Sequence, residues 1–351
     1  MRADDFDYVL PDECVAQVPL EPRDASRLMV CHRDTGILER RVFADLIDYL
    51  HSGDTLVIND SRVLPARLMG HKSGTGGAVE LLLLKRLSLT RWEALVRPGA
   101  RLRPGARVEF GGMQEDNSGY NSSPLRADIT DHAPGNARVV EFAWDNGTFE
   151  QLLDKLGEMP LPPYIREKLT DPERYQTVYS ARAGSAAAPT AGLHFTKELL
   201  SRIEAKGVDI ARVLLHVGLG TFRPVQTADV ESHEMHSEYY EVTEDAAFKI
   251  NRARKSGHKV VCVGTTSVRV VESAAANGSV VSSSSWTSIY IYPGYKYQIV
   301  DAIVTNFHLP KSTLMMLVSA FWSREAVLNA YRTAVDEGYR FYSFGDAMLI
   351  I

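Results

Sequence analysis

The segment TNFHLPKSTL, residues 305–314, places an amide and an imidazole among apolar residues, where packing alone would favour aliphatic side chains. Residues 298–304 before it alternate as in a strand, and Ser312 can cap a helix that follows. A strand, a loop and a helix in this order would hold Asn306 and His308 at a strand end, where open sheets bind ligands. A histidine that only satisfies a nearby carbonyl group is the alternative.

A second segment, VVCVGTTSVR at residues 260–269, indicates an anion site. It is typical of a buried strand followed by a helix, so Thr265 and Thr266 would lie at the helix start beside free backbone N–H groups. Arg269, one turn later, could bind a carboxylate or phosphate through two N–H groups. A capped helix in which Arg269 pairs with Glu272 is the alternative.

A loop of small residues at 184–195 carries Thr190, a substrate-binding candidate, and His194, which directly precedes the helix-capping Thr196. So little side-chain bulk would let the loop close over a ligand. A helix start favours the neutral form of His194, and a neutral imidazole can act as a base. A plain flexible loop is the alternative.

The segment HVGLGTFRP, residues 216–224, follows a predicted strand, and its two glycines would let the backbone approach a ligand closely. It does not match the dinucleotide-binding pattern GxGxxG, which weighs against hydride transfer and routine methylation. His216 is a further catalytic candidate. The substrate-binding candidates here are Gly218, Gly220, Thr221 and Arg223.

His233 and His236 suggest a metal site, but their spacing of three residues fails the HExxH pattern. Surface charge, or recognition of a polar ligand edge, is the favoured interpretation, and we predict no metal ligand in the chain.

The whole chain, at 351 residues, is long enough for about two domains, and its 45% hydrophobic and 24% charged residues are ordinary for a soluble globular protein. Three scattered cysteines favour a reducing compartment. The start lacks the pattern of an export signal, and the longest apolar stretch, residues 314–322, is too short to span a membrane. We therefore expect a cytoplasmic protein.

The net charge of −5 argues against a generally basic nucleic-acid-binding surface, but the charge is unevenly distributed. Residues 62–110 contain ten Lys and Arg against three Glu, a net charge of +7 that leaves −12 for the remainder. Such a segment would give a polyanion a preferred face and a salt-dependent affinity. A solvated, arginine-rich barrel surface is the alternative.

The arrangement of predicted elements indicates an insertion. Residues 79–140 read as short strands separated by Gly and Pro turns, typical of a small barrel or sandwich. After Phe149 helices alternate with strands, among them capped helices at Thr196 and Thr243 and strands at 288–292 and 339–344.

The opening segment, with a helix at 43–50, also suits an α/β body. We therefore predict the α/β fold class, a large mixed α/β domain with an inserted small all-β barrel. The predicted boundaries are residues 1–61 and 150–351 for the α/β domain and 62–149 for the barrel.

The chain closely resembles the S-adenosylmethionine:tRNA ribosyltransferase-isomerase family of queuosine biosynthesis. The matching motifs, in order, are DFDYVLP, NDSRVLPARLMG, RYQTVYS, AAPTAGLHF, HVGLGTFRPV, HSEYYEV, VGTTSVR, PGYKYQIVDAIVTNFHLPKSTL and YRFYSFGDAMLI. The departures, residues 111–136 and 282–285, look like local insertions or drift. The resemblance implies transfer and isomerisation of the ribosyl group of S-adenosylmethionine onto 7-aminomethyl-7-deazaguanine at the tRNA wobble position. Epoxyqueuosine-tRNA, adenine and methionine would be the products.

The resemblance also implies no metal or prosthetic group, since S-adenosylmethionine is consumed as a substrate. Such chemistry needs a base, an acid for adenine departure and an anion site for the methionine carboxylate. The proton-transfer candidates are His194, His216 and His308. Arg269 with Thr265 and Thr266 would form the anion site, while Asn306 would contact substrate.

Three further roles are expected. Asp301 or Glu272 could orient an imidazole. Tyr295 or Phe222 could face the sulfonium through cation–π attraction. Arg101 and Arg103 are the first candidates for tRNA phosphate contacts.

Two other functions stay open, a metal-dependent hydrolase built on His233 and His236 and a non-catalytic RNA-binding protein. The sequence does not distinguish a monomer from a homodimer.

Overall fold

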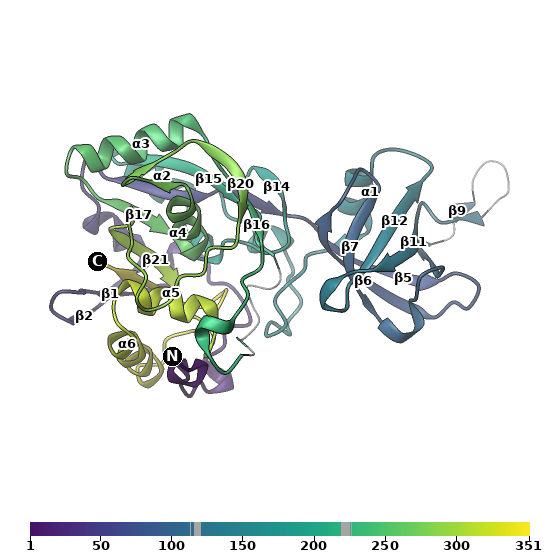
Figure 1. Cartoon of the computed structure of the whole chain (residues 1–351), viewed down its shortest axis with the longest axis horizontal. Helices are drawn as coiled ribbons and strands as arrows, with labels where there is room; N and C mark the ends of the chain where they lie inside the picture. Colours follow the sequence, from purple (N-terminus) through teal and green to yellow (C-terminus); the bar gives the residue numbers. More distant parts are fainter. Residues whose placement is uncertain (113, 116–120, 219–224, 226) are drawn as a thin grey trace. The chain divides into compact units, whose positions relative to one another are not determined.

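The computed structural model describes residues 1–112, 114–115, 121–218, 225 and 227–351. The chain divides into two compact units, one formed by Met1–Arg62 with Pro162–Ile351 and the other by Val63–Leu161 (Figure 1). The second unit ends later than the predicted boundary at residue 149, because a helix and a short strand after that point pack on its barrel. No helix in the described ranges combines the length and apolar character that crossing a membrane would take.

The larger unit is built on a nine-stranded mixed sheet (Figure 1). In spatial order its strands are β2 (Leu38–Val42), β1 (Arg27–Cys31), β22 (Ala347–Ile350), β21 (Ala302–Asn306), β17 (Val260–Val263), β3 (Thr55–Asn59), β15 (Asp209–Leu215), β16 (Glu238–Val242) and β20 (Ser283–Thr287). Four neighbours, β21, β17, β3 and β15, run parallel to one another, so their carboxyl ends meet at one edge of the sheet.

Helices cover both faces of this sheet. They are α2 (Lys197–Ala205), α3 (Glu244–Lys255), α4 (Gly264–Ser273), α5 (Thr313–Phe321) and α6 (Arg324–Asp336). Alternate strand residues enter opposite cores: Leu56 and Ile58 pack with α2, whereas Val57 packs in the core that includes α3 to α6. Because the central strands are buried on both faces, they are continuously apolar rather than alternating.

The smaller unit is a closed antiparallel barrel. Its strands follow the order β5 (Arg67–Lys72), β6 (Ala78–Arg86), β7 (Arg91–Arg97), β12 (Arg138–Trp144), β11 (Leu125–His132) and β8 (Arg107–Phe110), and β8 pairs with β5 to close the ring. Gly70 permits this closure, since a Cβ there would lie 2.5 Å from the backbone oxygen of Glu109. Helix α1 (Phe149–Leu156) and strand β13 (Gly157–Glu158) complete the unit. The predicted fold class is confirmed.

Three predicted elements are wrong in place or type. The strand expected at 298–304 is β21, which starts at Ala302, so Asn306 is its last residue rather than part of a loop. The strand expected at 339–344 is instead a turn in which Tyr342 has a φ of 69°, and the closing strand is β22. The strand expected at 288–292 does not form, since the edge strand β20 ends at Thr287.

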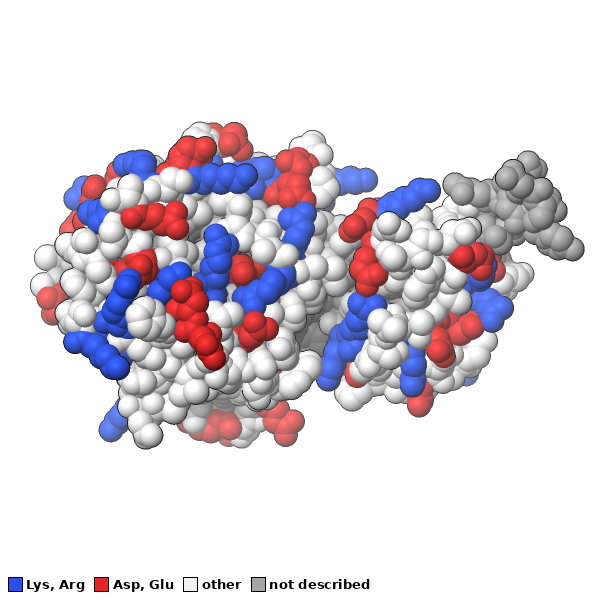
Figure 2. Space-filling view, turned by 90° about the horizontal axis from the view of Figure 1, so that it is seen from above, with Lys and Arg blue, Asp and Glu red and all other residues white. Residues whose placement is uncertain are grey.

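The charge split seen in the sequence does not divide the two units. Val63–Leu161 contains twelve Lys and Arg against twelve Asp and Glu, so this unit has no net charge. Two arginines of the basic segment pair with acidic residues from later in the unit, Arg86 with Glu150 and Arg107 with Asp128. Figure 2 shows basic and acidic side chains interspersed over the faces that it presents.

Candidate active site

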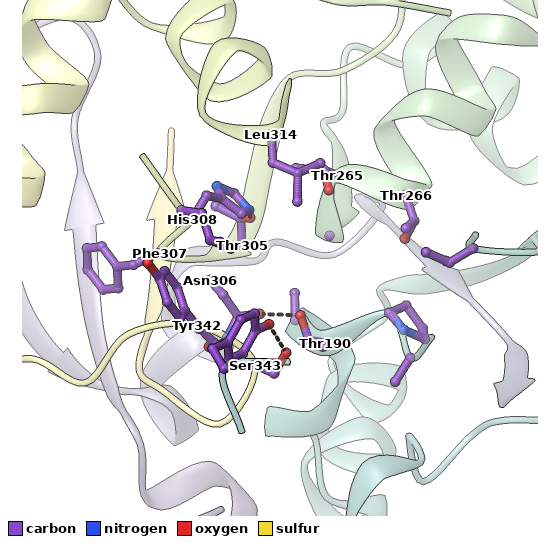
Figure 3. Close-up of a pocket in the computed structure, with 17 residues that line it drawn as sticks. Thr190, Thr265, Thr266, Thr305, Asn306, Phe307, His308, Leu314, Tyr342 and Ser343 are labelled. Carbon is purple, nitrogen blue, oxygen red and sulfur yellow. Dashed lines mark hydrogen bonds between the residues drawn. The ribbon is translucent and has the colours of Figure 1, made fainter. Parts of the chain in front are cut away.

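A pocket lies at the carboxyl ends of the parallel strands, which we call the strand-end pocket (Figure 3). Its wall follows β21 and β17 directly, and Val217 just beyond β15 also lines it. The polar residues that line it are Tyr164, Thr190, Thr265, Thr266, Thr305, Asn306, His308, Tyr342 and Ser343. Within the described parts of the chain, no Lys, Arg, Asp or Glu side chain lines this pocket.

Asn306 is held by hydrogen bonds on both ends of its amide. Its Oδ1 accepts from the Thr190 hydroxyl at 3.1 Å (Figure 3), and its Nδ2 donates to the Tyr342 carbonyl oxygen at 3.2 Å and to Nε2 of His194 at 3.0 Å. Since an amide NH2 group only donates, Nε2 of His194 is the acceptor. Nδ1 of His194 then carries the proton and donates to the Ser26 hydroxyl at 2.7 Å.

His194 therefore lies behind Asn306 and does not line the strand-end pocket. Its ring is buried and stacks on Phe43 with ring centres 4.9 Å apart. Burial, with smaller contributions from Arg340 and Arg23, lowers the pKa of His194 to about 3. The neutral form expected at a helix start is present, but burial rather than the helix is its main cause.

His308 lines the strand-end pocket, with both ring nitrogens engaged. The Tyr331 hydroxyl oxygen accepts the backbone N–H of His308 at 3.0 Å and lies 3.2 Å from Nδ1 of the ring. The Tyr331 hydroxyl therefore donates its hydrogen to Nδ1, which acts as the acceptor. Nε2 then carries the ring proton and donates to the Thr305 hydroxyl at 3.0 Å. Burial lowers the pKa of His308 to about 3.

His216 lies next to the strand-end pocket without lining it. Its partly buried ring stacks on Tyr239, with centres 5.9 Å apart, and Nδ1 has no hydrogen-bond partner among the described residues. Burial and Arg182 lower the pKa of His216, whereas Asp60 acts in the opposite direction. It differs from the other two histidines in having a ring nitrogen that no described group occupies.

The start of α4 faces the strand-end pocket through Gly264, Thr265 and Thr266. Gly264 has a φ of 81°, which favours glycine, and no side chain in the described ranges caps the helix. The Thr266 hydroxyl is buried and finds no hydrogen-bond partner among the described residues. Uncapped N–H groups and a free hydroxyl together suit an anionic group of a ligand.

Arg269 does not line the pocket and is not free to bind a ligand through its whole guanidinium group. It forms an ion pair with Glu238, and the two side chains are 3% and 4% exposed. The alternative pairing with Glu272 is also wrong. Glu238 additionally accepts the backbone N–H of Gly218 at 2.6 Å, so this pair joins α4 to the segment after β15.

Two orienting roles expected from the sequence are contradicted. Glu272 accepts the Tyr295 hydroxyl at 3.0 Å and several backbone N–H groups, and Asp301 accepts the backbone N–H of Val260 at 2.8 Å, so neither orients an imidazole. Tyr295 does not line the strand-end pocket.

The remaining candidates whose positions the structure describes do not line this pocket. Arg101 and Arg103 belong to the smaller unit, where both are exposed. His233 packs against Tyr290 and His236 is exposed. Gly220, Thr221, Arg223 and the aromatic candidate Phe222 lie outside the described residues.

Sequence reasoning missed the aromatic wall of the pocket. Tyr164 lies in the run PLPPY, and its hydroxyl bonds the Ser343 hydroxyl at 2.7 Å. Tyr342 packs on Tyr164 with ring centres 4.7 Å apart. The prolines before Tyr164 are typical of an ordered turn, but no local pattern connects Tyr164 to Tyr342, because the contact joins distant parts of the chain.

Comparisons with known proteins agree over the full chain. The sequence matches the family described as queuosine biosynthesis protein over residues 3–350. It is 56% identical to the S-adenosylmethionine:tRNA ribosyltransferase-isomerase of Moorella thermoacetica and 57% identical to that of Symbiobacterium thermophilum, each covering 100% of both chains. It also resembles the crystal structure of the S-adenosylmethionine tRNA ribosyltransferase of Thermotoga maritima, with 38% identity, a TM-score of 0.56 and coverage of 99% of this chain and 100% of that chain.

Proposed function

This chain belongs to the queuosine biosynthesis protein family and acts as a tRNA ribosyltransferase-isomerase, and we propose that its strand-end pocket binds S-adenosylmethionine. One observation carries the proposal. Five residues predicted from separate segments, Thr190, Thr265, Thr266, Asn306 and His308, line the same pocket. This edge of a parallel sheet is also where such folds bind nucleosides.

The methionine carboxylate would bind at the start of α4. Backbone N–H groups there and the free hydroxyl of Thr266 are donors, and the helix dipole favours a negative charge. The sulfonium would lie against the aromatic wall of Tyr164 and Tyr342 through cation–π attraction.

The nucleoside would contact acceptor groups. Both N–H groups of the Asn306 amide are already used, so the amide offers only its oxygen to a ligand. Thr190 donates its proton to that oxygen and is left as an acceptor. An exocyclic amino group or ribose hydroxyls supply the matching donors.

We propose His216 as the base that removes the proton made acidic by the sulfonium. A base needs an unoccupied lone pair, and both ring nitrogens of His194 and His308 have protein partners. A pKa of about 3 also makes His308 a poor proton acceptor near neutral pH. His308 would act by fixing the hydroxyl of Thr305 in the pocket.

The proposed nucleic-acid substrate is tRNA bearing 7-aminomethyl-7-deazaguanine at the wobble position, with epoxyqueuosine-tRNA, adenine and methionine as products. Arg101 and Arg103 of the smaller unit are proposed to contact tRNA phosphates, because both are exposed and have no ion-pair partner among the described residues. We also propose a cytoplasmic location, where tRNA is modified, and a reaction that needs no metal or prosthetic group.

The test is incubation of the enzyme with S-adenosylmethionine and the modified tRNA. Adenine and methionine should appear in equal amounts, and activity should survive dialysis against a chelator. S-adenosylhomocysteine as the product would indicate methyl transfer instead. Loss of activity with the chelator would favour the metal-dependent hydrolase, and tRNA binding without adenine release would indicate a non-catalytic RNA-binding protein.

A further inference from the structure

A second cavity in the larger unit adjoins the candidate active site, and we call it the arginine cavity. It is lined by Pro19, Leu20, Arg23, Ser26, Arg174 and His194, with residues 343–345 and Leu193 completing the wall. Ser343 lines both cavities, and His194 bonds Asn306 of the strand-end pocket. The proposed function leaves this cavity without a role.

Arg23 reaches the arginine cavity with no counter-ion. Its guanidinium donates to the backbone oxygens of Glu173 and Gln176, both at 3.0 Å, and of Leu193 at 3.3 Å. No carboxylate in the described residues lies within ion-pair distance of it. Burial, followed by the neighbouring charge of Arg174, lowers the pKa of Arg23. Neutral backbone oxygens thus hold this positive charge against the cavity, and the carboxylates of Glu21, Asp171 and Glu173 compensate it only from beyond ion-pair distance.

Arg174 adds a second guanidinium with weak compensation. It donates to the backbone oxygen of Leu20 and lies 3.3 Å from the carboxylate of Glu21. The Arg174 side chain is 17% exposed, whereas that of Glu21 is 76% exposed. An exposed partner is screened by water, so this pair leaves much of the Arg174 charge unbalanced.

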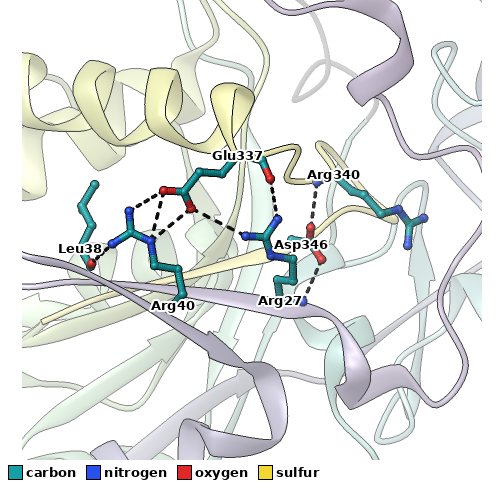
Figure 4. Close-up of polar contacts among 6 residues, drawn as sticks. All are labelled: Arg27, Leu38, Arg40, Glu337, Arg340 and Asp346. Carbon is teal, nitrogen blue, oxygen red and sulfur yellow. Dashed lines mark hydrogen bonds and ion pairs between the residues drawn. The ribbon is translucent and has the colours of Figure 1, made fainter.

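Arg340 does not line the arginine cavity, but its positive charge, partly compensated by Asp346, acts on His194 in the cavity wall. Its backbone N–H bonds the carboxylate of Asp346 at 2.8 Å, but its guanidinium extends away from that carboxylate (Figure 4). The guanidinium donates to the backbone oxygen of Val18, and its Nη1 is buried without a partner among the described residues. Burial is the main cause of the low pKa of His194, and the charges of Arg340 and Arg23 lower that pKa further, so both charges act on this wall.

Buried charges are normally paired, because an uncompensated charge loses its hydration. The guanidinium groups of Arg23 and Arg174, which line this cavity, therefore indicate an oxyanion as the missing partner, and guanidinium groups match phosphate oxygens in geometry. Ser26 can donate to the same anion, since its oxygen already accepts the proton of His194 Nδ1. Leu20, which lines the cavity, is exposed, so the cavity opens to solvent and a nucleic-acid chain that carries the anion can extend out of it.

We propose that the arginine cavity binds a backbone phosphate of the tRNA substrate. The inference rests on the proposed function, which supplies the polyanion and assigns the methionine carboxylate to α4 in the other pocket. A phosphate here would contact Ser26, which connects through His194 to Asn306. The hydrogen bonds from Ser26 through His194 to Asn306 would then couple RNA binding in the arginine cavity to the position of Asn306 in the strand-end pocket.

The test is tRNA affinity against salt for Arg23→Gln and Arg174→Gln. Each variant should bind tRNA about ten- to hundredfold more weakly at low salt, since a charged hydrogen bond is lost. The slope of log affinity against log salt should fall by about 0.7–0.9 for the lost phosphate contact. Arg332→Gln is the matched control, because Arg332 is exposed on α6 and makes no described ion pair, and it should leave the slope unchanged.

Arg23 also donates hydrogen bonds to three backbone carbonyl groups, so Arg23→Gln could lower the stability of the fold. The melting temperature of each variant is therefore measured together with its tRNA affinity. The wild-type enzyme gives an independent measurement. Inorganic phosphate should compete with tRNA more strongly than chloride at equal ionic strength, and this difference should disappear in Arg174→Gln.

Two results would overturn the inference, namely unchanged tRNA affinity and slope in both folded variants, or phosphate competing with S-adenosylmethionine rather than with tRNA. Failure of the wild-type enzyme to bind S-adenosylmethionine would instead refute the proposed function.

Discussion

Replacing Thr266 by valine should weaken ligand binding while leaving the free enzyme as stable as before or more stable. The exchange keeps the branched shape of the side chain and removes only the hydroxyl. That hydroxyl is buried, lines the strand-end pocket and has no partner among the described residues. An unsatisfied buried polar group costs about 1–3 kcal/mol, so its removal relieves part of that cost.

The effect on binding has the opposite sign. A hydrogen bond to a charged carboxylate contributes about 1.5–3 kcal/mol, and 1.4 kcal/mol corresponds to a tenfold change in affinity. Thr266→Val should therefore bind S-adenosylmethionine about ten- to hundredfold more weakly. Its melting temperature should stay constant or rise, by about 2–4 °C for each kcal/mol relieved in a unit of this size.

Isothermal titration with S-adenosylmethionine and a thermal melt of the free enzyme measure the two effects separately. Ser319→Ala is the matched control, because the Ser319 hydroxyl is also buried without a described partner but does not line the pocket. It should affect stability in the same direction and leave the affinity unchanged. Wild-type affinity in Thr266→Val, or a melting temperature several degrees lower, would refute the assignment of Thr266 to the ligand.

Three further predictions concern the histidines and the smaller unit. His216→Gln should strongly reduce adenine release and remove the acidic limb from the pH profile of the residual activity, whereas His308→Gln should reduce the rate and keep the profile; equal profiles in both variants would remove His216 as the base. Burial lowers the pKa of His194 and of His308 from 6.5 to about 3, so the unfolded chain binds two protons that the folded protein does not. Stability should be constant above pH 6.5 and fall as pH drops toward 3, by up to about 1.4 kcal/mol per pH unit for each histidine; a denaturation series in which His194→Gln keeps the wild-type slope would contradict this. Neutralising Arg101 and Arg103 together should weaken tRNA binding and flatten its salt dependence, and an unchanged salt slope would reject the barrel as a docking surface.

The helices of the larger unit could be predicted because their signals are local. Thr196, Thr243 and Ser312 each accept a backbone N–H from the first turn of the helix that they precede, as their positions in the sequence indicated. The inserted barrel was equally visible, since short strands and Gly turns repeat along one segment. Element type and order follow from such neighbours in the sequence.

The partners of charged and polar side chains could not be predicted in the same way. Arg269 has Glu272 three positions later on its own helix, yet it forms an ion pair with Glu238 on strand β16. His194 and His308 are equivalent proton-transfer candidates in the sequence. Only the fold shows that His308 lines the strand-end pocket and that His194 lies behind Asn306 in the pocket wall. These contacts join residues far apart in the chain, so no local spacing encodes them.

The neutral lining of the strand-end pocket fits the charge changes that the reaction requires. Removing a proton beside the sulfonium creates a carbanion next to a cation, and a nearby carboxylate would hold the cation and oppose the new negative charge. A protonated imidazole would repel the sulfonium before reaction. Burial lowers the pKa of His194 and of His308 to about 3, and the described lining of the pocket offers hydroxyl, amide and aromatic groups rather than charged side chains. In the proposed binding mode the sulfonium would therefore be held by aromatic faces rather than by a carboxylate, and the anionic groups of both substrates would bind at α4 and in the arginine cavity.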